Sequence, residues 1–87
     1  MTPFYQLRYT PEASEGISKL PSNLKKIAEQ VLLKISENPQ LGKRLLGRLK
    51  GISSIRVTIH YRILYMVKYA EKEIVILDLK HRKEVYD

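Results

Sequence analysis

Apolar residues occupy every second position from Tyr5 to Tyr9, near the start of the chain. A period of two is typical of a strand that buries one of its faces. Thr10 and the proline after it then offer a helix N-cap and a residue suited to a first helical turn. This pattern predicts a strand over residues 3–9 and a short helix over residues 11–19.

The clearest helical period begins after Leu20-Pro21-Ser22, which interrupts the first helix. Apolar residues then recur at the spacing that places them along one side of a helix: Leu24, Ile27, Ala28, Val31, Leu32 and Ile35. The helix should end at Asn38-Pro39, because proline disfavours the helical conformation in the residue before it. The two helices are therefore expected to form an antiparallel pair.

Glycines and basic residues are mixed with leucines between Leu41 and Gly51. Glycine tolerates backbone conformations that other residues avoid, so we expect a bendable connection here. A short strand is predicted at Arg48-Leu49, and the leucines are expected to anchor the loop to the core.

Strict alternation returns between Ile55 and His60. A strand with this pattern buries one set of side chains and presents the other set to the opposite face. The set predicted to be buried is Ile55, Val57 and Ile59. The set predicted to share the exposed face is Arg56, Thr58 and His60.

Two more strands are predicted over residues 61–69 and 73–79, with a turn at residues 70–72 between them. Tyrosines recur at every fourth position of the first of these strands, beginning with Tyr61. They share a face with apolar residues and are expected in or near the core. The predicted fold is an α+β domain spanning residues 1–87. An N-terminal strand and a two-helix hairpin pack on a curved antiparallel β-sheet.

Charge and composition narrow the function classes. Sixteen lysines and arginines against nine acidic residues give a net charge of +7, which favours a polyanionic partner such as nucleic acid or an acidic protein. The chain has no cysteine and only two histidines, so we expect neither a metal nor another cofactor. With no apolar run long enough to span a bilayer and no signal-peptide pattern, a cytoplasmic location without membrane attachment is expected.

Three motifs in this order resemble the RelE/ParE family of bacterial and archaeal toxins, the toxic halves of toxin–antitoxin pairs. They are Leu46-Gly47-Arg48-Leu49-Lys50-Gly51, the block from Arg56 to Val67, and the ending His81-Arg82-Lys83-Glu84-Val85-Tyr86. The resemblance spans nearly the whole chain. It implies the fold described above, and on the RelE side of the family a ribosome-dependent mRNA endonuclease that cuts without metal through the ribose 2′-hydroxyl.

The resemblance also implies a set of catalytic residues. Arg56 matches a basic residue on the strand that enters the site, Arg62 the arginine of a Tyr-Arg motif, Arg82 the arginine near the end, and Tyr86 the terminal tyrosine. Arg62 is the first choice for holding the scissile phosphate, since a guanidinium presents a fork of donors that matches phosphate oxygens.

Further residues are candidates on their chemistry alone. His81 is a possible acid or base, because imidazole titrates near neutral pH, although a histidine in this place is more often structural. Tyr86 offers a ring for stacking on an unpaired base or an anchor for the tail. Contacts with RNA are expected from a basic flank, which comprises Lys43, Arg44, Arg48 and Lys50 together with His60.

The resemblance implies partners as well as chemistry. They are the ribosome, mRNA and a small acidic antitoxin of the RelB kind that wraps a toxin which is monomeric when free. Two other functions stay open: inhibition of DNA gyrase in the manner of ParE, without cleavage, and antitoxin binding without any toxicity. The first is kept open by Thr58, which stands where the best-known RelE enzymes carry a second lysine. The segment from Arg82 to Tyr86 is also a residue shorter than in those enzymes, which leaves the placement of Tyr86 open.

Overall fold

Five strands and two helices follow one another along residues 4–81, the part of the chain that the computed structural model describes. The strands are β1 (Gln6–Tyr9), β2 (Lys43–Arg44), β3 (Ser53–Arg56), β4 (Tyr61–Lys68) and β5 (Glu73–His81). The helices are α1 (Pro11–Ser18) and α2 (Ser22–Glu37), and two single 3-10 turns are η1 (Pro39–Leu41) and η2 (Gly47–Leu49). The α+β class and the expected order of elements are confirmed.

Thr10 fixes the junction between β1 and α1. Its side-chain Oγ1 accepts a hydrogen bond from the backbone N–H of Ala13 at 3.1 Å, which caps the helix. The same hydroxyl donates to the carbonyl of Leu77 at 2.6 Å and so ties the helix start to β5. The predicted N-cap is therefore confirmed, and it also positions α1 on the sheet.

The strand order of the sheet is β1-β5-β4-β3-β2. Strands β2 to β5 pair in antiparallel fashion, but β1 pairs with β5 in parallel, with Leu7 opposite Ile74. The antiparallel meander is confirmed, and the sheet as a whole is mixed because β1 joins its edge in parallel. The helical pair and the meander lie between β1 and β5 in sequence, and they bring β5 back beside β1 in the same direction.

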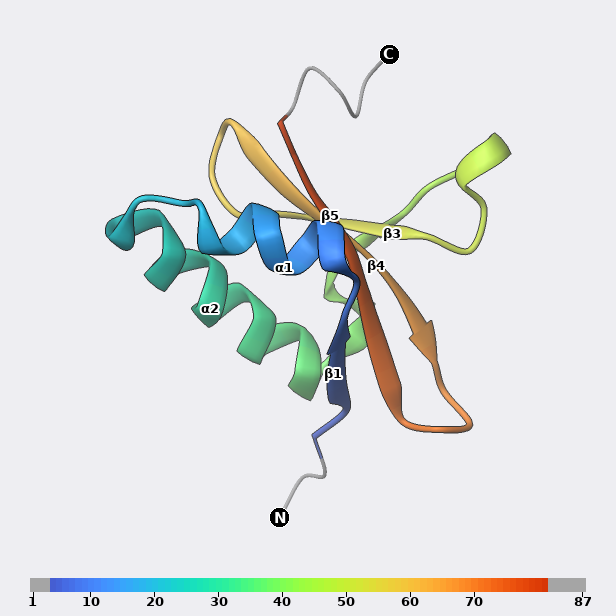
Figure 1. Ribbon diagram of the computed structural model, residues 1–87. Coiled ribbons are helices and arrows are strands. Elements are labelled where there is room, and N and C mark those ends of the chain that lie inside the picture. The colour runs from blue at the N-terminus through green and yellow to red at the C-terminus, as the bar shows by residue number, and fades with distance from the viewer. Residues whose placement is uncertain (1–3, 82–87) are drawn as a thin grey trace.

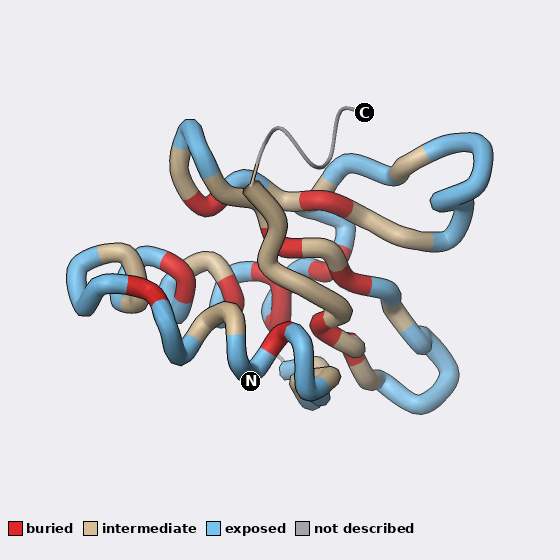
Figure 2. Tube along the Cα trace, turned by 45° about the horizontal axis from the view of Figure 1, so that its top comes forward, coloured by how far each residue is buried: buried red, intermediate tan, exposed pale blue. Residues whose placement is uncertain are grey.

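Both helices cover one face of the twisted sheet, which we call the core face (Figure 1). The buried part of the chain lies between these two layers (Figure 2). The largest fully buried side chains belong to α2, β4 and β5: Tyr65, Ile35, Ile63, Ile74 and Ile76. The other face, which we call the open face, carries the alternate residues of each strand.

A bulge in β5 changes which of its residues face the core. Tyr65 pairs with Ile76, whereas the preceding residue Leu64 pairs with Asp78, so Leu77 is an extra residue on β5. The even-numbered Ile74 and Ile76 face the core before the bulge. After it the odd-numbered residues take that face.

The segment between η1 and β3 differs from the prediction. Its strand is the two-residue β2, and Arg48-Leu49 lies in η2 instead. Gly47 takes a φ of +70°, a conformation that favours glycine, and this bends the backbone away from an extended path. Leu46 is 87% exposed, so the expected anchoring of the leucines is wrong at this position.

The alternation from Ile55 to His60 is interrupted after Arg56, where β3 ends. The backbone N–H groups of Val57 and Thr58 both donate to the carbonyl of Tyr61, and the chain reverses direction. Val57 is buried as predicted, but Ile59 lies in the turn and is 61% exposed, against expectation. The hydrogen bonds of the turn therefore set the backbone conformation here, and the alternation of apolar and polar residues does not predict it.

Tyr65 links the core to the loop after α2. Its hydroxyl donates to the carbonyl of Pro39 at 2.8 Å and accepts from the N–H of Gly42 at 2.9 Å. Burial raises the pKa of Tyr65 above its ordinary value, although the hydrogen bond from Gly42 opposes this. The predicted core role of this tyrosine is confirmed, whereas Tyr69 at the end of the same strand is 45% exposed.

Ser54 should be a position where loss of a polar group stabilises the fold. Its hydroxyl is buried and has no hydrogen-bond partner within the described residues. An unsatisfied buried hydroxyl is costly, so Ser54→Ala is expected to raise the free energy of unfolding by about 1 kcal/mol in urea titrations.

Ser36 provides the matched control for this measurement. It is buried to a similar degree, but its hydroxyl donates to the carbonyl of Leu33 at 2.6 Å. Ser36→Ala should therefore bring no stabilisation. Equal losses of stability in the two variants would show that the Ser54 hydroxyl contributes a favourable interaction, contrary to this prediction.

Candidate functional site

Three basic residues lie side by side across the last three strands. Arg56 of β3 is the register partner of Arg62 of β4, and Arg62 is in turn the partner of Lys80 of β5. Residues opposite one another in a sheet project from the same face. We call this set, Arg56, Arg62 and Lys80, the basic row.

The basic row lies on the open face of the sheet. Ile63, which follows Arg62, is fully buried on the core face, so Arg62 projects to the other side. Arg62 is half-buried and Arg56 exposed. No helix covers this face in the described part of the chain (Figure 1).

Asp78 helps to set the position of one member of the row. Its carboxylate lies 3.3 Å from the Nζ atom of Lys80, two residues further along the same face of β5. Even with this carboxylate nearby, the row brings three cations together and leaves a surplus of positive charge. Such a cluster is suited to bind a phosphodiester and to stabilise charge that develops on it.

The two histidines are brought together elsewhere. The rings of His60 and His81 stack with their centroids 5.8 Å apart, and the ring of Tyr61 meets His81 edge-on at 5.6 Å. Tyr61 is the register partner of His81, one position before Arg62, so this pair projects to the core face rather than to the open face.

The expectation that His60 shares a face with Arg56 was therefore wrong. The turn after Arg56 breaks the alternation on which that expectation was based. Within the turn, the hydroxyl oxygen of Thr58 accepts a hydrogen bond from the N–H of His60 at 3.2 Å, and this fixes the local backbone.

The basic flank predicted to bind RNA is exposed and lies apart from the row. Lys43 and Arg44 form β2 at the edge of the sheet, and Arg48 and Lys50 belong to the segment around η2. Figure 1 shows this segment reaching away from the β3–β4 turn. Arg82 and Tyr86, the two remaining candidates, lie outside the described residues.

Lys80 is a member of the site that sequence reasoning missed. Read with the simple alternation of β5, it would share the face of Ile74 and Ile76 and lie against the core. The bulge at Leu77 reverses that alternation and turns Lys80 to the open face. In the sequence, a role for Lys80 was indicated only by its position just before the His81-Arg82 motif.

Tyr9, like Tyr65, has a displaced pKa. It lies on the core face of β1, beside the helices, where burial raises the pKa of its hydroxyl and the nearby Glu29 carboxylate raises it further. This tyrosine lies apart from the basic row, because Tyr9 is on the core face whereas the basic row projects from the open face.

Two kinds of site are not found in the described part of the chain. Residues 4–81 contain no group of three or more acidic, histidine or cysteine side chains placed to hold a metal ion. Over the same residues, neither helix has the length and apolar character that crossing a membrane requires.

Comparison with protein families gives one match along most of the chain. A family model described as the ParE toxin of the type II toxin–antitoxin system parDE matches residues 7–86. No curated protein sequence matches this chain.

Solved structures are similar over almost the same extent. A chain of the toxin–antitoxin complex RelBE2 from Mycobacterium tuberculosis is 30% identical with a TM-score of 0.82, and the match covers 94% of this chain and 95% of that one. The YoeB/ParE toxin from Agrobacterium tumefaciens is 15% identical with a TM-score of 0.80, covering 88% and 98%.

An archaeal structure extends this likeness. A chain of the RelE–RelB complex from Pyrococcus horikoshii is 22% identical with a TM-score of 0.73, covering 94% of this chain and 97% of that one. At these identities the Agrobacterium and Pyrococcus proteins show a shared fold alone. The Mycobacterium protein adds a likeness in sequence.

Proposed function

Because this chain belongs to the RelE/ParE family of toxins from type II toxin–antitoxin systems, we propose that it is an mRNA interferase, an endonuclease that cuts mRNA on the ribosome. The observation that carries this proposal is the basic row on the open face. Three cations aligned on one face of the sheet suit the binding of a phosphodiester and the charge that develops on it during cleavage.

The proposed reaction uses the substrate's own nucleophile. The ribose 2′-oxygen forms a bond to the adjacent phosphorus as its proton leaves, and the bond from phosphorus to the 5′-oxygen breaks as that oxygen gains a proton. The products are a 2′,3′-cyclic phosphate and a free 5′-hydroxyl. Extra negative charge develops on the phosphate oxygens, and preorganised donors that meet this charge lower the barrier.

In this mechanism Arg62 holds the scissile phosphate, because it occupies the middle of the basic row with a cation on either side. Arg56 and Lys80 contact the same phosphate or its neighbours. Since an arginine is a poor proton donor at neutral pH, we assign these residues to electrostatic stabilisation rather than to proton transfer.

The remaining candidates keep proposed roles of their own. Arg82 and Tyr86 are proposed, from the family resemblance, to stabilise the transition state and to stack on an exposed base. His81 projects to the face opposite Arg62, and its stacking on His60 favours a role in positioning the end of β5 over direct acid or base catalysis.

The proposed partners follow from charge. The exposed basic flank, Lys43, Arg44, Arg48 and Lys50, is suited to the phosphate backbone of ribosomal RNA, whose charge dominates such binding. The net charge of +7 equally suits an acidic antitoxin that inhibits the toxin in the cytoplasm.

Cleavage of a defined mRNA on programmed ribosomes tests this proposal. We expect cuts at defined codon positions that require both the ribosome and this protein. The yield should be the same whether or not the protein is treated with EDTA and dialysed before it is added to intact ribosomes in magnesium buffer. Uncut mRNA in the presence of fully active ribosomes would contradict the proposal.

Inhibition of DNA gyrase is the second candidate function. Two observations favour it: the matching family model is that of ParE toxins, and Thr58 stands where RelE enzymes carry a lysine. A supercoiling assay separates the candidates, because an interferase should leave gyrase active at concentrations that cut mRNA.

A further inference from the structure

A groove lies on the core face of the sheet, beyond the end of α2. Its cavity volume is about 400 Å³, and its lining comes from β2, the segment around η2, β3 and the end of β4. A second hollow of about 360 Å³ shares Arg44, Ser53 and Tyr69 with it and is also lined by Pro39, Gln40 and Gly42, in and just after η1. We call the two hollows together the β2 groove.

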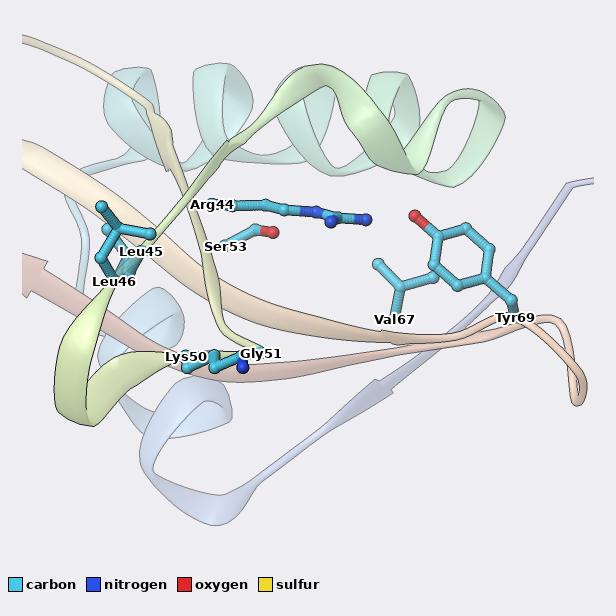
Figure 3. A pocket seen from close by; sticks show the side chains of 8 residues that line it. All are labelled: Arg44, Leu45, Leu46, Lys50, Gly51, Ser53, Val67 and Tyr69. Atoms are coloured by element: carbon cyan, nitrogen blue, oxygen red, sulfur yellow. The ribbon is translucent and has the colours of Figure 1, made fainter.

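The first hollow of the β2 groove has a mainly apolar lining with a basic rim, whereas the second hollow is lined mainly by polar groups. Figure 3 shows Arg44 and Tyr69 pointing toward each other, with Val67 between them, and Leu45 and Leu46 at the other end. Lys50 adds a second cation at the rim. Among the described residues that line either hollow, none is acidic.

Exposed apolar side chains line this groove and occur close to it in the sequence. Leu46 is 87% exposed and Tyr69 45%, and Leu41 and Leu49 nearby in sequence are 51% and 39% exposed. Clustered exposure of large apolar groups beside a hollow marks a surface that a protein partner covers. RNA would gain little from the leucines, since it binds through phosphates and base stacking.

We propose that the β2 groove binds an acidic segment of the cognate antitoxin that also carries apolar side chains. Apolar side chains of the segment occupy the interior along Val67 and Leu46, and its carboxylates meet Arg44 and Lys50 at the rim. This inference rests on the antitoxin partner in the proposed function and adds the surface that holds it.

The groove and the basic row lie on opposite faces of the sheet. Ser53 and Val67 share the core face with Tyr65, whereas Arg56 and Arg62 project from the open face. A segment in the groove therefore anchors the antitoxin without touching the basic row. Binding at the groove and the chemical step at the basic row should then be separable by mutation of Leu46, whereas Arg44 and Lys50 also belong to the flank proposed to contact ribosomal RNA.

The experiment measures binding of purified cognate antitoxin to the full chain in the Arg62→Ala background, so that no nuclease activity is required. Leu46→Glu and Arg44→Glu are each expected to weaken binding by at least roughly tenfold, through repulsion of carboxylates and loss of apolar contact. Both positions are exposed, so the fold should tolerate the changes.

Two matched variants control for surface apolarity and for net charge. Leu33→Glu changes an exposed leucine that lies on α2. Lys26→Glu, also on α2, reverses one positive charge, as Arg44→Glu does on β2. Neither residue lines the groove, and both variants should bind the antitoxin as tightly as the parent. Equal losses in groove and control variants would overturn the proposal.

A single-stranded RNA oligonucleotide serves as the competing probe. If Leu46→Glu abolished binding of this RNA and left antitoxin binding intact, the groove would belong to RNA and the proposal would be wrong. If instead wild-type protein failed to cut mRNA but Leu46→Glu still lost the antitoxin, the nuclease function would fail and the groove assignment would stand.

Discussion

Replacing Arg62 with alanine is expected to lower the rate of mRNA cleavage on the ribosome by about 100- to 1,000-fold, the usual effect of removing one preorganised donor from a transition state. Arg62 has a cation in register on each side, Arg56 and Lys80, so its loss leaves a gap at the centre of the site. Single-turnover cleavage at saturating protein gives the chemical rate directly.

Arg8→Ala is the matched control for this change. Arg8 lies on the same open face, on β1, and its Nε atom pairs with the Glu73 carboxylate at 3.2 Å, away from the basic row. Cleavage by this variant should match the wild-type rate. Arg62→Lys keeps the charge but loses the forked geometry, and an intermediate rate is expected. A wild-type rate in Arg62→Ala would remove the basic row from the mechanism.

Gly42→Ala is expected to lower the free energy of unfolding by about 1–3 kcal/mol, the usual cost of overpacking a close-packed site. A Cβ at this position would contact the hydroxyl of Tyr65 and approach its Cε1 and Cζ atoms at 2.8 and 2.9 Å. The ring is fully buried and cannot move aside easily. The φ of −76° at Gly42 suits alanine, so the cost is steric. Urea titration measures it.

Tyr65→Phe tests the cause of this loss. On its own the change should destabilise the fold by roughly 1–3 kcal/mol, because it leaves the N–H of Gly42 and the carbonyl of Pro39 without their partner. In the phenylalanine background Gly42→Ala should cost less, since one of the contacting atoms is gone. Strictly additive losses would show that the hydroxyl does not cause the clash.

The extent to which the sequence predicts this fold depends on how local each signal is. The apolar period of α2 and the cap at Thr10 act over one or two helical turns, and both were predicted closely. The path after α2 was not, because β2 is a two-residue strand whose position depends on pairing with β3 rather than on its own residues. The turn at residues 57–60 likewise depends on backbone hydrogen bonds that the alternation of side chains conceals.

The candidate site was predicted only in part, for a related reason. Arg56 and Arg62 were identified from motifs, but their pairing with Lys80 requires the register between β4 and β5. That register contains a bulge at Leu77, and no pattern in the sequence predicts this extra residue in β5. The same bulge separates His81 from the arginines.

Because the groove and the basic row lie on different faces of the sheet, substitutions on one face can leave the other face unchanged. Substitutions around Leu46 and Tyr69 change the surface proposed to meet a partner, while Arg62 and its neighbours stay as they are on the other side. Under the proposed roles, a change in the choice of inhibitor therefore need not alter the residues proposed to cut RNA. The short, exposed segment around η2 is where such a change would be made.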